Sequence, residues 1–178
     1  MPLDSAHAKQ LIAAKPEPMA FSYSDREVML YALGIGLGQN PLDPNELPFV
    51  YEKNLKVVPT FATVATFNAR AAAGAPPRQG LAMNYALYLH GEQRLTIHKP
   101  LPVGGKFTTE SQMLGVYDKG AAKGAVIVQQ SVIRDESGDP ICTLGNTGFA
   151  RGDGGFGGPS DGAPEPHPVP TPAHDKEP

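Results

Sequence analysis

The sequence predicts an α+β domain in which helices come first and an antiparallel sheet follows. Two observations carry this prediction. A helix-like run with an N-terminal capping box opens the domain, and four β-rich runs separated by glycine-containing turns fill its second half. Apolar residues make up 40% of the 178 residues, which is enough for one hydrophobic core. A curled antiparallel sheet packed around one helix would bury the segment "VPTFATVATF".

The first half holds the predicted helices. A short helix is expected over residues 6–14, inside a leader of residues 1–20. Ser24 and Glu27 form a capping box that starts a second helix, and Gly34 ends it. The segment "FVYEKNLKVV" favours a short strand. The segment "PTFATVATFNARAAA" favours a helix, because it has proline in its first turn and is rich in alanine, and "APPRQG" then ends it.

The second half changes to strand patterns. Its four runs are "GEQRLTIHKPLP", "GGKFTTESQMLGVYDKG", "AAKGAVIVQQSVIRDESG" and "DPICTLGNTGFARG", and the last three alternate with a period of two. The stretches "DKGAAKG" and "DESGDP" predict hairpin turns. The folded domain is therefore expected over residues 21–151. Residues 152–178 contain 13 glycines and prolines in 27 positions, so a linker or disordered tail is expected there.

The composition excludes several classes of function. The 15 basic and 18 acidic residues give a net charge of −3, so neither nucleic acid nor an anionic membrane is an expected partner. No segment has the length of a membrane span, and no apolar signal region opens the chain. A single cysteine excludes an internal disulfide and fits a reducing, cytosol-like compartment.

The glycine-rich stretch "GIGLGQNPLDP", residues 34–44, is the first candidate site. It lacks the G-x-G-x-x-G spacing and follows a helix instead of a strand, which argues against a nucleotide loop. The histidines do not have metal-ligand spacing, so no metal is expected, and no G-x-S-x-G occurs. Taken alone, the stretch is a turn with one carboxylate, because Asp43 precedes Pro44 as a turn or N-cap residue does.

A second candidate lies where "LYLHGEQRL" enters a strand. His90 could contact a ligand there, and Gly91 would let a backbone N–H approach it closely. Lys119, in the hairpin "VYDKGAAKGA", is either a solvated turn residue or a contact to a phosphate group. His98, inside its strand, is expected to be structural, and Cys142 is expected to be a core thiol.

Longer motifs resemble one known family. The runs "LHGEQRLTIHKPLPVGGKF", "VYDKG", "RDESGDPICT" and "FARGDGGFGG" are similar to the N-terminal half of MaoC-like, R-specific enoyl-CoA hydratases, a group that includes the hydratase unit of the peroxisomal type-2 multifunctional enzyme. The likeness extends over residues 21–158. It implies a hot-dog fold, in which an antiparallel sheet wraps around a long central helix. It also implies the reversible addition of water to a trans-2-enoyl-CoA, which gives the R-3-hydroxyacyl-CoA.

The resemblance further implies a division of work between two hot-dog halves. In the family, the C-terminal half carries a catalytic Asp and His in a D-x-N-P-L-H motif, and the N-terminal half makes room for the acyl chain. Here the corresponding stretch is degenerate: Asn40, Pro41 and Leu42 match, whereas Gly38 stands at the Asp position and Asp43 at the His position. We therefore expect a non-catalytic chain that needs a catalytic hot-dog partner, either in the same chain or as a separate one.

The ligand contacts follow from the same resemblance. His90, Gly91 and Lys119 would line the route of coenzyme A, which is part of the acyl-CoA substrate and not a separate cofactor. The open sheet edge of a single half predicts dimerisation. The compartment would be the cytoplasm of a bacterium or the peroxisome of a eukaryote. Two alternatives remain open. One is a self-sufficient homodimeric hydratase, dehydratase or thioesterase that uses His90, Asp43 or Glu92, and the other is a scaffolding module without a ligand.

Overall fold

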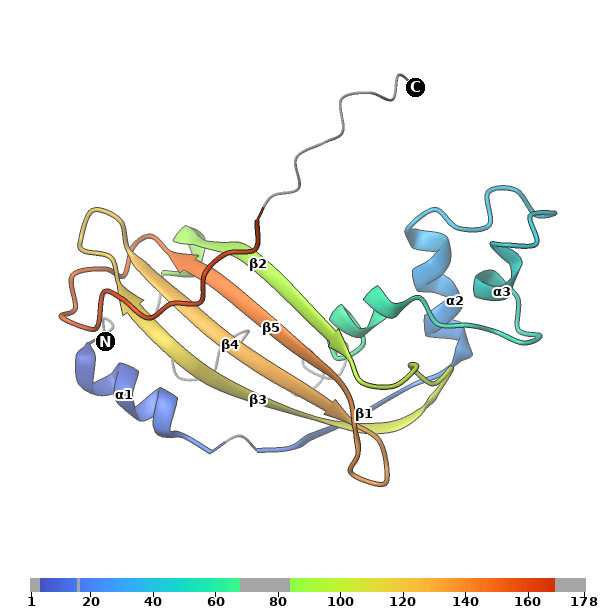
Figure 1. Cartoon of the computed structure of the whole chain (residues 1–178), viewed down its shortest axis with the longest axis horizontal. Helices are drawn as coiled ribbons and strands as arrows, with labels where there is room; N and C mark the ends of the chain where they lie inside the picture. Colours follow the sequence, from blue (N-terminus) through green and yellow to red (C-terminus); the bar gives the residue numbers. More distant parts are fainter. Residues whose placement is uncertain (1–3, 16, 68–83, 169–178) are drawn as a thin grey trace, which may run out of the picture.

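A computed structural model describes residues 4–15, 17–67 and 84–168 of the chain. These residues form one curled antiparallel sheet with the strand order β1-β3-β4-β5-β2 (Figure 1). The strands are β1 (Met19–Tyr23), β2 (Tyr88–Ile97), β3 (Gly105–Asp118), β4 (Ala125–Arg134) and β5 (Pro140–Ala150). The predicted antiparallel sheet is therefore confirmed, with helices placed mainly at its two ends.

Strands β3, β4 and β5 form a meander, as the alternation of their sequences predicts. The turn between β3 and β4 uses Gly120 and Gly124 at φ values of +88° and +87°, a backbone conformation that favours glycine. Strand β2 pairs with β5, with Leu95 opposite Leu144. Strand β1 pairs with the other side of β3. The sequence did not predict β1, which begins inside the expected leader.

Two helices lie where the sequence predicts them, α1 at Ser5–Ala13 and α2 at Asp25–Gly34. The predicted capping box is confirmed, because the Glu27 carboxylate accepts hydrogen bonds from the Ser24 backbone N–H (2.8 Å) and hydroxyl (2.6 Å). Helix α1 packs against β3 near one end of the sheet, whereas α2 lies at the opposite end beside a third helix, α3 (Leu47–Val50) (Figure 1).

The strand expected over residues 49–58 is wrong. Pro48 lies in the first turn of α3, where proline fits a helix start. Asn54 then adopts φ +58° and reverses the chain, and the Lys56 N–H donates to the Pro48 carbonyl oxygen at 2.6 Å. A reversed segment of this kind has no neighbouring strand to pair with.

The helix expected over residues 59–73 begins as a 3₁₀ helix, η1 (Pro59–Thr63), continues as turns over residues 64–66 and is α-helical at Phe67. Its remainder from residue 68 onward lies outside the described residues. Within the described ranges, no α-helix runs along the length of the sheet. A second 3₁₀ turn, η2 (Tyr85–Leu87), leads directly into β2.

The alternation of the strands gives the sheet two different faces. We call inner the face that carries both hydrophobic clusters, and outer the opposite face. The first cluster lies at the α2 end, where Phe61 of η1 meets the Tyr23 ring edge-on at 4.9 Å between centroids, and Tyr23 stacks on Phe107. The second cluster lies at the α1 end and packs α1 against residues such as Val116 and Ile127.

Candidate functional site

The degenerate motif, residues 38–43, forms the loop between α2 and α3. The Asn40 carbonyl oxygen accepts from the Asp43 N–H (3.1 Å), and the Asn40 side chain accepts from the Leu42 N–H (3.1 Å). Pro41 therefore occupies the second position of a β-turn, where its fixed φ fits. Leu42 is 84% exposed at the tip of this turn.

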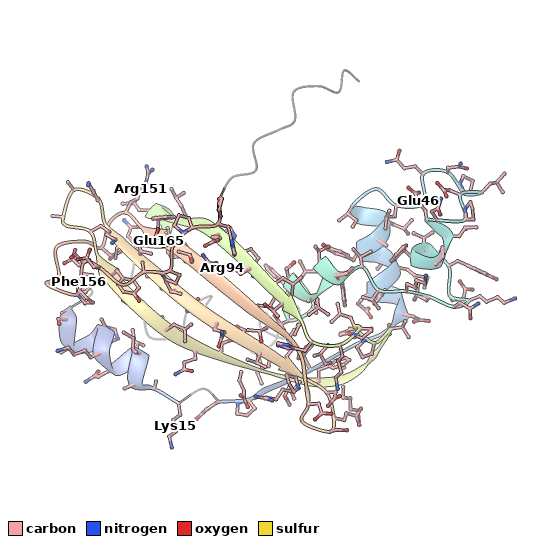
Figure 2. All side chains as sticks on the ribbon, in the orientation of Figure 1. Lys15, Glu46, Arg94, Arg151, Phe156 and Glu165 are labelled. Carbon is pink, nitrogen blue, oxygen red and sulfur yellow. The ribbon has the colours of Figure 1, made fainter. Side chains whose placement is uncertain are left out.

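The two positions that differ from the family motif are used by the backbone of this loop. One Asp43 carboxylate oxygen accepts from the Asn45 N–H at 2.8 Å, and the Asp43 carbonyl oxygen accepts from the Leu47 N–H at 3.0 Å, so Asp43 acts as a turn residue. Gly38 has φ +81° and donates its N–H to the Glu46 carboxylate at 2.7 Å. Figure 2 shows Glu46 at this end of the molecule. Gly38 and Asp43 together therefore do not form an acid–base pair.

His90 and Gly91 lie in β2 at an irregularity of the β2–β5 pairing, between His90 and Glu92. His90 is exposed, and its Nδ1 lies 3.0 Å from the Asn146 amide nitrogen. A Cβ on Gly91 would lie 2.3 Å from Cε2 of Phe149, so the Phe149 ring covers this glycine. In the structure, a glycine is thus required at position 91 for packing against Phe149. The close approach of a ligand, which the sequence suggested, would be a second reason for a glycine there.

Glu92 is a weak candidate for a general base. Its carboxylate forms an ion pair with Arg94 at 2.9 Å, and the Arg94 guanidinium holds the pKa of Glu92 below its usual range. Because the pairing irregularity separates His90 from Glu92, the two side chains lie on opposite faces of the sheet. His90 and Glu92 therefore do not form one catalytic pair.

Lys119 lies in the β3–β4 turn beside a carboxylate that binds backbone. Asp118 accepts from the N–H groups of Gly155 (2.7 Å), Gly157 (2.7 Å) and Gly120 (2.8 Å). These hydrogen bonds, that of Gly155 foremost, hold the pKa of Asp118 below its usual range. The Lys119 ammonium donates to the Ser160 carbonyl oxygen. Both side chains thus hold the segment that follows β5.

That segment, residues 152–168, crosses the outer face of the sheet from β3 toward β2 (Figure 1). The Asp118 N–H donates to the Pro159 carbonyl oxygen at 2.8 Å, and the Arg94 guanidinium donates to the Glu165 carbonyl oxygen at 2.6 Å. Figure 2 shows Arg94 and Glu165 side by side above β2. The first part of the expected linker is therefore hydrogen-bonded to the domain.

The predicted site residues fall into two groups. His90 and Lys119 lie toward the same end of the sheet, but β4 and β5 separate their strands, which corresponds to about 14 Å between strand axes. The motif loop lies at the opposite end, with α2 and α3 (Figure 1). The structure therefore does not bring the degenerate motif together with the predicted coenzyme A contacts.

A cavity of about 750 Å³ was not predicted from the sequence. It lies at the end of β2 far from His90, between α3, the approach to η1 and the loop after β2, and its lining is mainly apolar: Phe49, Leu55, Lys56, Val57, Pro59, Ile97, His98, Lys99, Pro100 and Leu101. Its size is typical of small-molecule sites.

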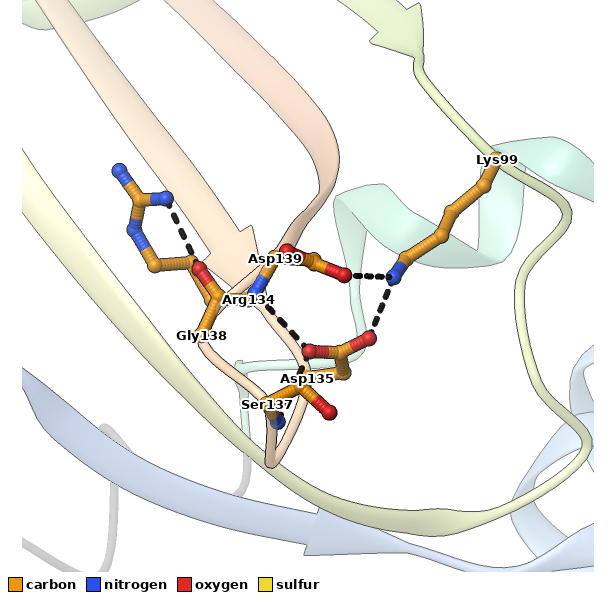
Figure 3. Close-up of polar contacts among 6 residues, drawn as sticks. All are labelled: Lys99, Arg134, Asp135, Ser137, Gly138 and Asp139. Carbon is orange, nitrogen blue, oxygen red and sulfur yellow. Dashed lines mark hydrogen bonds and ion pairs between the residues drawn. The ribbon is translucent and has the colours of Figure 1, made fainter.

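One wall of this cavity is fixed by an ion pair. Lys99 binds the carboxylates of Asp135 and, at 3.6 Å, Asp139, as Figure 3 shows. Asp135 also accepts from the N–H groups of Ser137 and Asp139, both at 3.0 Å, so the β4–β5 turn is tied to the loop after β2. The Asp135 carboxylate raises the pKa of Lys99, so this ammonium stays charged and remains paired with Asp135. Lys56, exposed, is the other lysine in the lining.

The remaining chemistry of the described residues is sparse. They contain no group of three or more His, Cys, Asp or Glu side chains that could hold a metal ion. None of the helices in the same ranges is long and apolar enough to cross a membrane. Burial raises the pKa of the Cys142 thiol to about 11, as expected for a core cysteine and not for a nucleophile. His98 contacts the Thr143 hydroxyl at 2.8 Å, in line with its expected structural character.

Comparison with known proteins decides the family. Residues 21–152 match the family described as MFE-2 hydratase 2 N-terminal domain. The chain belongs to this family. Among curated relatives, it is 34% identical over 174 residues to Enoyl-CoA hydratase ChsH3 of Mycobacterium tuberculosis, covering 93% of this chain and 58% of that protein. It is 36% identical over 152 residues to the peroxisomal Enoyl-CoA hydratase 2 of Arabidopsis thaliana, covering 82% of this chain and 48% of that protein.

The fold of this MFE-2 hydratase 2 N-terminal domain agrees with a solved structure. A MaoC-like dehydratase from Phytophthora capsici superposes with a TM-score of 0.74 at 28% identity, over 92% of this chain and 56% of that one. The predicted α+β hot-dog class is thereby confirmed, as is the resemblance to MaoC-like enoyl-CoA hydratases. The chain spans about half the length of the curated relatives it matches.

Proposed function

We propose that this hydratase 2 N-terminal domain is the acyl-CoA-binding, non-catalytic half of an R-specific 2-enoyl-CoA hydratase. One observation carries the proposal. At the positions of the family's catalytic Asp and His, Gly38 has no side chain, and the Asp43 carboxylate accepts a hydrogen bond from the Asn45 backbone. Water addition to an enoyl thioester requires a general base and a proton donor. Gly38 can be neither, and Asp43 alone does not make the pair.

The ligand route proposed here runs along the inner face of the sheet. His90, Gly91 and Lys119, at one end of the sheet, would contact coenzyme A, and the exposed Lys119 ammonium would exchange its hydrogen bond to the Ser160 carbonyl oxygen for one to a phosphate group. The acyl chain would extend from there toward the apolar cavity of about 750 Å³ at the other end of β2. His90 and Ile97 are seven residues apart along β2, which corresponds to about 23 Å of strand.

A catalytic hot-dog partner would complete the enzyme. Strand β2 is an edge strand of the described sheet, so one side of its backbone is open to pairing. A group of large apolar side chains is exposed at the α2–α3 end: Leu30, Leu33, Ile35, Leu42 and Tyr51. Exposed apolar groups of this kind mark interaction surfaces. The two relatives named above are about twice as long as the matched region, which is consistent with a second half.

The experiment compares three preparations with a trans-2-enoyl-CoA, following loss of the enoyl absorbance. The chain alone, a hot-dog chain that carries an intact D-x-N-P-L-H motif, and the mixture of both are assayed at equal concentrations. We expect no turnover by the chain alone and the highest turnover on bulky acyl groups from the mixture. Full turnover by the chain alone would refute the proposal and favour the self-sufficient enzyme.

Acyl-CoA binding separates the proposal from a scaffolding module. Titration calorimetry of the chain with dodecanoyl-CoA, alone and with the partner, measures this binding directly. We expect saturable binding that free coenzyme A reproduces only in part, because the inner face and cavity would hold the acyl chain. No binding in either condition would contradict the proposal and favour scaffolding.

A further inference from the structure

The inner face of the sheet is polar at its centre. Its two ends carry the two hydrophobic clusters. Most side chains between them are amides, hydroxyls and one imidazole, which we call the polar band: His90, Gln93, Ser111, Gln129, Ser131 and Asn146. Met113, opposite Gln129, and Leu144, opposite Ser131, are apolar neighbours of this band. Strand β4 displays the change most clearly, because its inward positions read Ile127, Gln129, Ser131 and Ile133 in order. An apolar acyl chain that covered this band would remove its polar groups from water without giving them hydrogen bonds, which is unfavourable.

Parts of the polar band already bind one another. The Asn146 amide nitrogen lies 3.0 Å from Nδ1 of His90 and 3.5 Å from the Gln93 side-chain oxygen, and the Ser111 and Ser131 hydroxyls lie 2.7 Å apart. These contacts join β2 to β5 and β3 to β4. Because Gln129 of β4 lies opposite Asn146 of β5, the band is continuous across four strands.

Other groups of the polar band have no hydrogen-bond partner among the described residues. The Asn146 side-chain oxygen is buried and accepts no hydrogen bond within the described part of the chain. Gln129 is half-buried, and its amide makes no hydrogen bond to another described residue. Unused donors and acceptors at the centre of a ligand-binding face favour a ligand that has polar groups at that point.

We propose that the polar band selects acyl groups that carry a hydroxyl or carbonyl oxygen in mid-chain, in preference to plain saturated chains of the same length. The inference rests on the proposed function, since it requires an acyl group on the inner face. The contacts are the Gln129 amide, which has no described partner, and the Ser131 hydroxyl, which keeps accepting capacity beside its contact to Ser111; both lie between the clusters on the strand at the middle of the sheet. A hydroxyl accepts and donates, and both groups can serve either need.

The test compares dodecanoyl-CoA with dodecanoyl-CoA that carries one hydroxyl in mid-chain, by titration calorimetry on the full chain. We expect the wild type to bind the hydroxylated thioester about 3- to 10-fold more tightly, the range of one neutral hydrogen bond. Gln129→Leu, and Ser131→Ala separately, should reduce that ratio toward one. The strand itself offers a matched control: Gln130→Leu changes the same residue type at the adjacent, outward-facing position and should leave the ratio unchanged.

The outcomes separate the two proposals. Binding of both thioesters with equal Kd in the wild type, or a ratio that Gln129→Leu and Ser131→Ala leave unchanged, would overturn the polar-band inference and leave the proposed function intact. A ratio that Gln130→Leu lowers as strongly as Gln129→Leu would also overturn it. Failure to bind either thioester, with or without the catalytic partner, would refute the proposed function and this inference with it. Circular dichroism melts confirm that each variant is folded.

Discussion

Replacing Gly91 by alanine tests whether this glycine is required for packing. Gly91 is not in the left-handed region, so the alanine backbone is allowed and the effect is steric. The new Cβ would lie 2.3 Å from Cε2 and 2.7 Å from Cδ2 of the Phe149 ring, whereas carbon atoms normally approach to about 3.5–4.0 Å. The Phe149 ring must therefore move by more than an ångström.

The magnitude follows from what the Phe149 ring loses. Phe149 is 42% exposed, so the ring can turn into solvent at the expense of its remaining burial. Full burial of such a side chain contributes about 1.5–3 kcal/mol, which leaves about 1–2 kcal/mol for this one. We expect Gly91→Ala to lower the free energy of unfolding by that amount.

Urea denaturation of a double-mutant cycle measures the effect. Phe149→Ala removes the ring, so Gly91→Ala should cost little in that background, with a coupling of about 1–2 kcal/mol. The control is Gly34→Ala, whose Cβ would meet nothing within 4 Å and which should be neutral or slightly stabilising. An equal cost of Gly91→Ala with and without Phe149 would refute the packing account. Normal stability of the double variant combined with lost acyl-CoA binding would instead support a direct ligand contact.

Three further predictions concern the core, the crossing segment and the ligand route. Phe61→Ala should lower the free energy of unfolding by about 3–5 kcal/mol in urea, because Phe61 is buried against Tyr23, and smaller loss would mean that the first cluster collapses around the gap. Asp118→Asn should accelerate limited proteolysis within residues 152–168. Since the Asp118 pKa is lowered on folding, its stabilisation is present above the unfolded value of about 3.9 and is lost as pH falls through the folded value, so wild-type cleavage should rise only in acid. His90→Ala, assayed with the catalytic partner, should raise KM several-fold and leave kcat unchanged, whereas loss of kcat would favour the self-sufficient enzyme.

The sequence predicted the parts of the fold that depend on local pattern. The Ser24–Glu27 capping box and the glycines of the β3–β4 turn specify their elements within a few residues, so they could be recognised directly. The strand wrongly expected over residues 49–58 also has a suitable pattern, but a strand requires a neighbour, and the reversal at Asn54 removes it. Strand β1 was missed for the opposite reason, because its five residues become a strand only by pairing with β3.

The candidate site was predictable only where residues act locally. The turn character of Asp43 follows from its neighbours, and the structure shows the hydrogen bond to the Asn45 N–H. The cavity at the end of β2 and the polar band could not be predicted, because both combine residues from several strands whose register the sequence does not specify. The contact between Gly91 and Phe149 is of the same kind, since the two residues meet only across the β2–β5 pair.

The degenerate motif differs from an active site by more than two side chains. An aspartate at position 38 would have to adopt φ +81°, a conformation that most residues reach only at a cost. Its Cβ would also lie 3.2 Å from both γ-methyl groups of Val50. A histidine at position 43 would remove the carboxylate that accepts from the Asn45 N–H and so weaken the turn into α3. Restoring the Asp and His together would therefore not rebuild the catalytic pair, because the backbone of this loop now depends on the residues that replaced them.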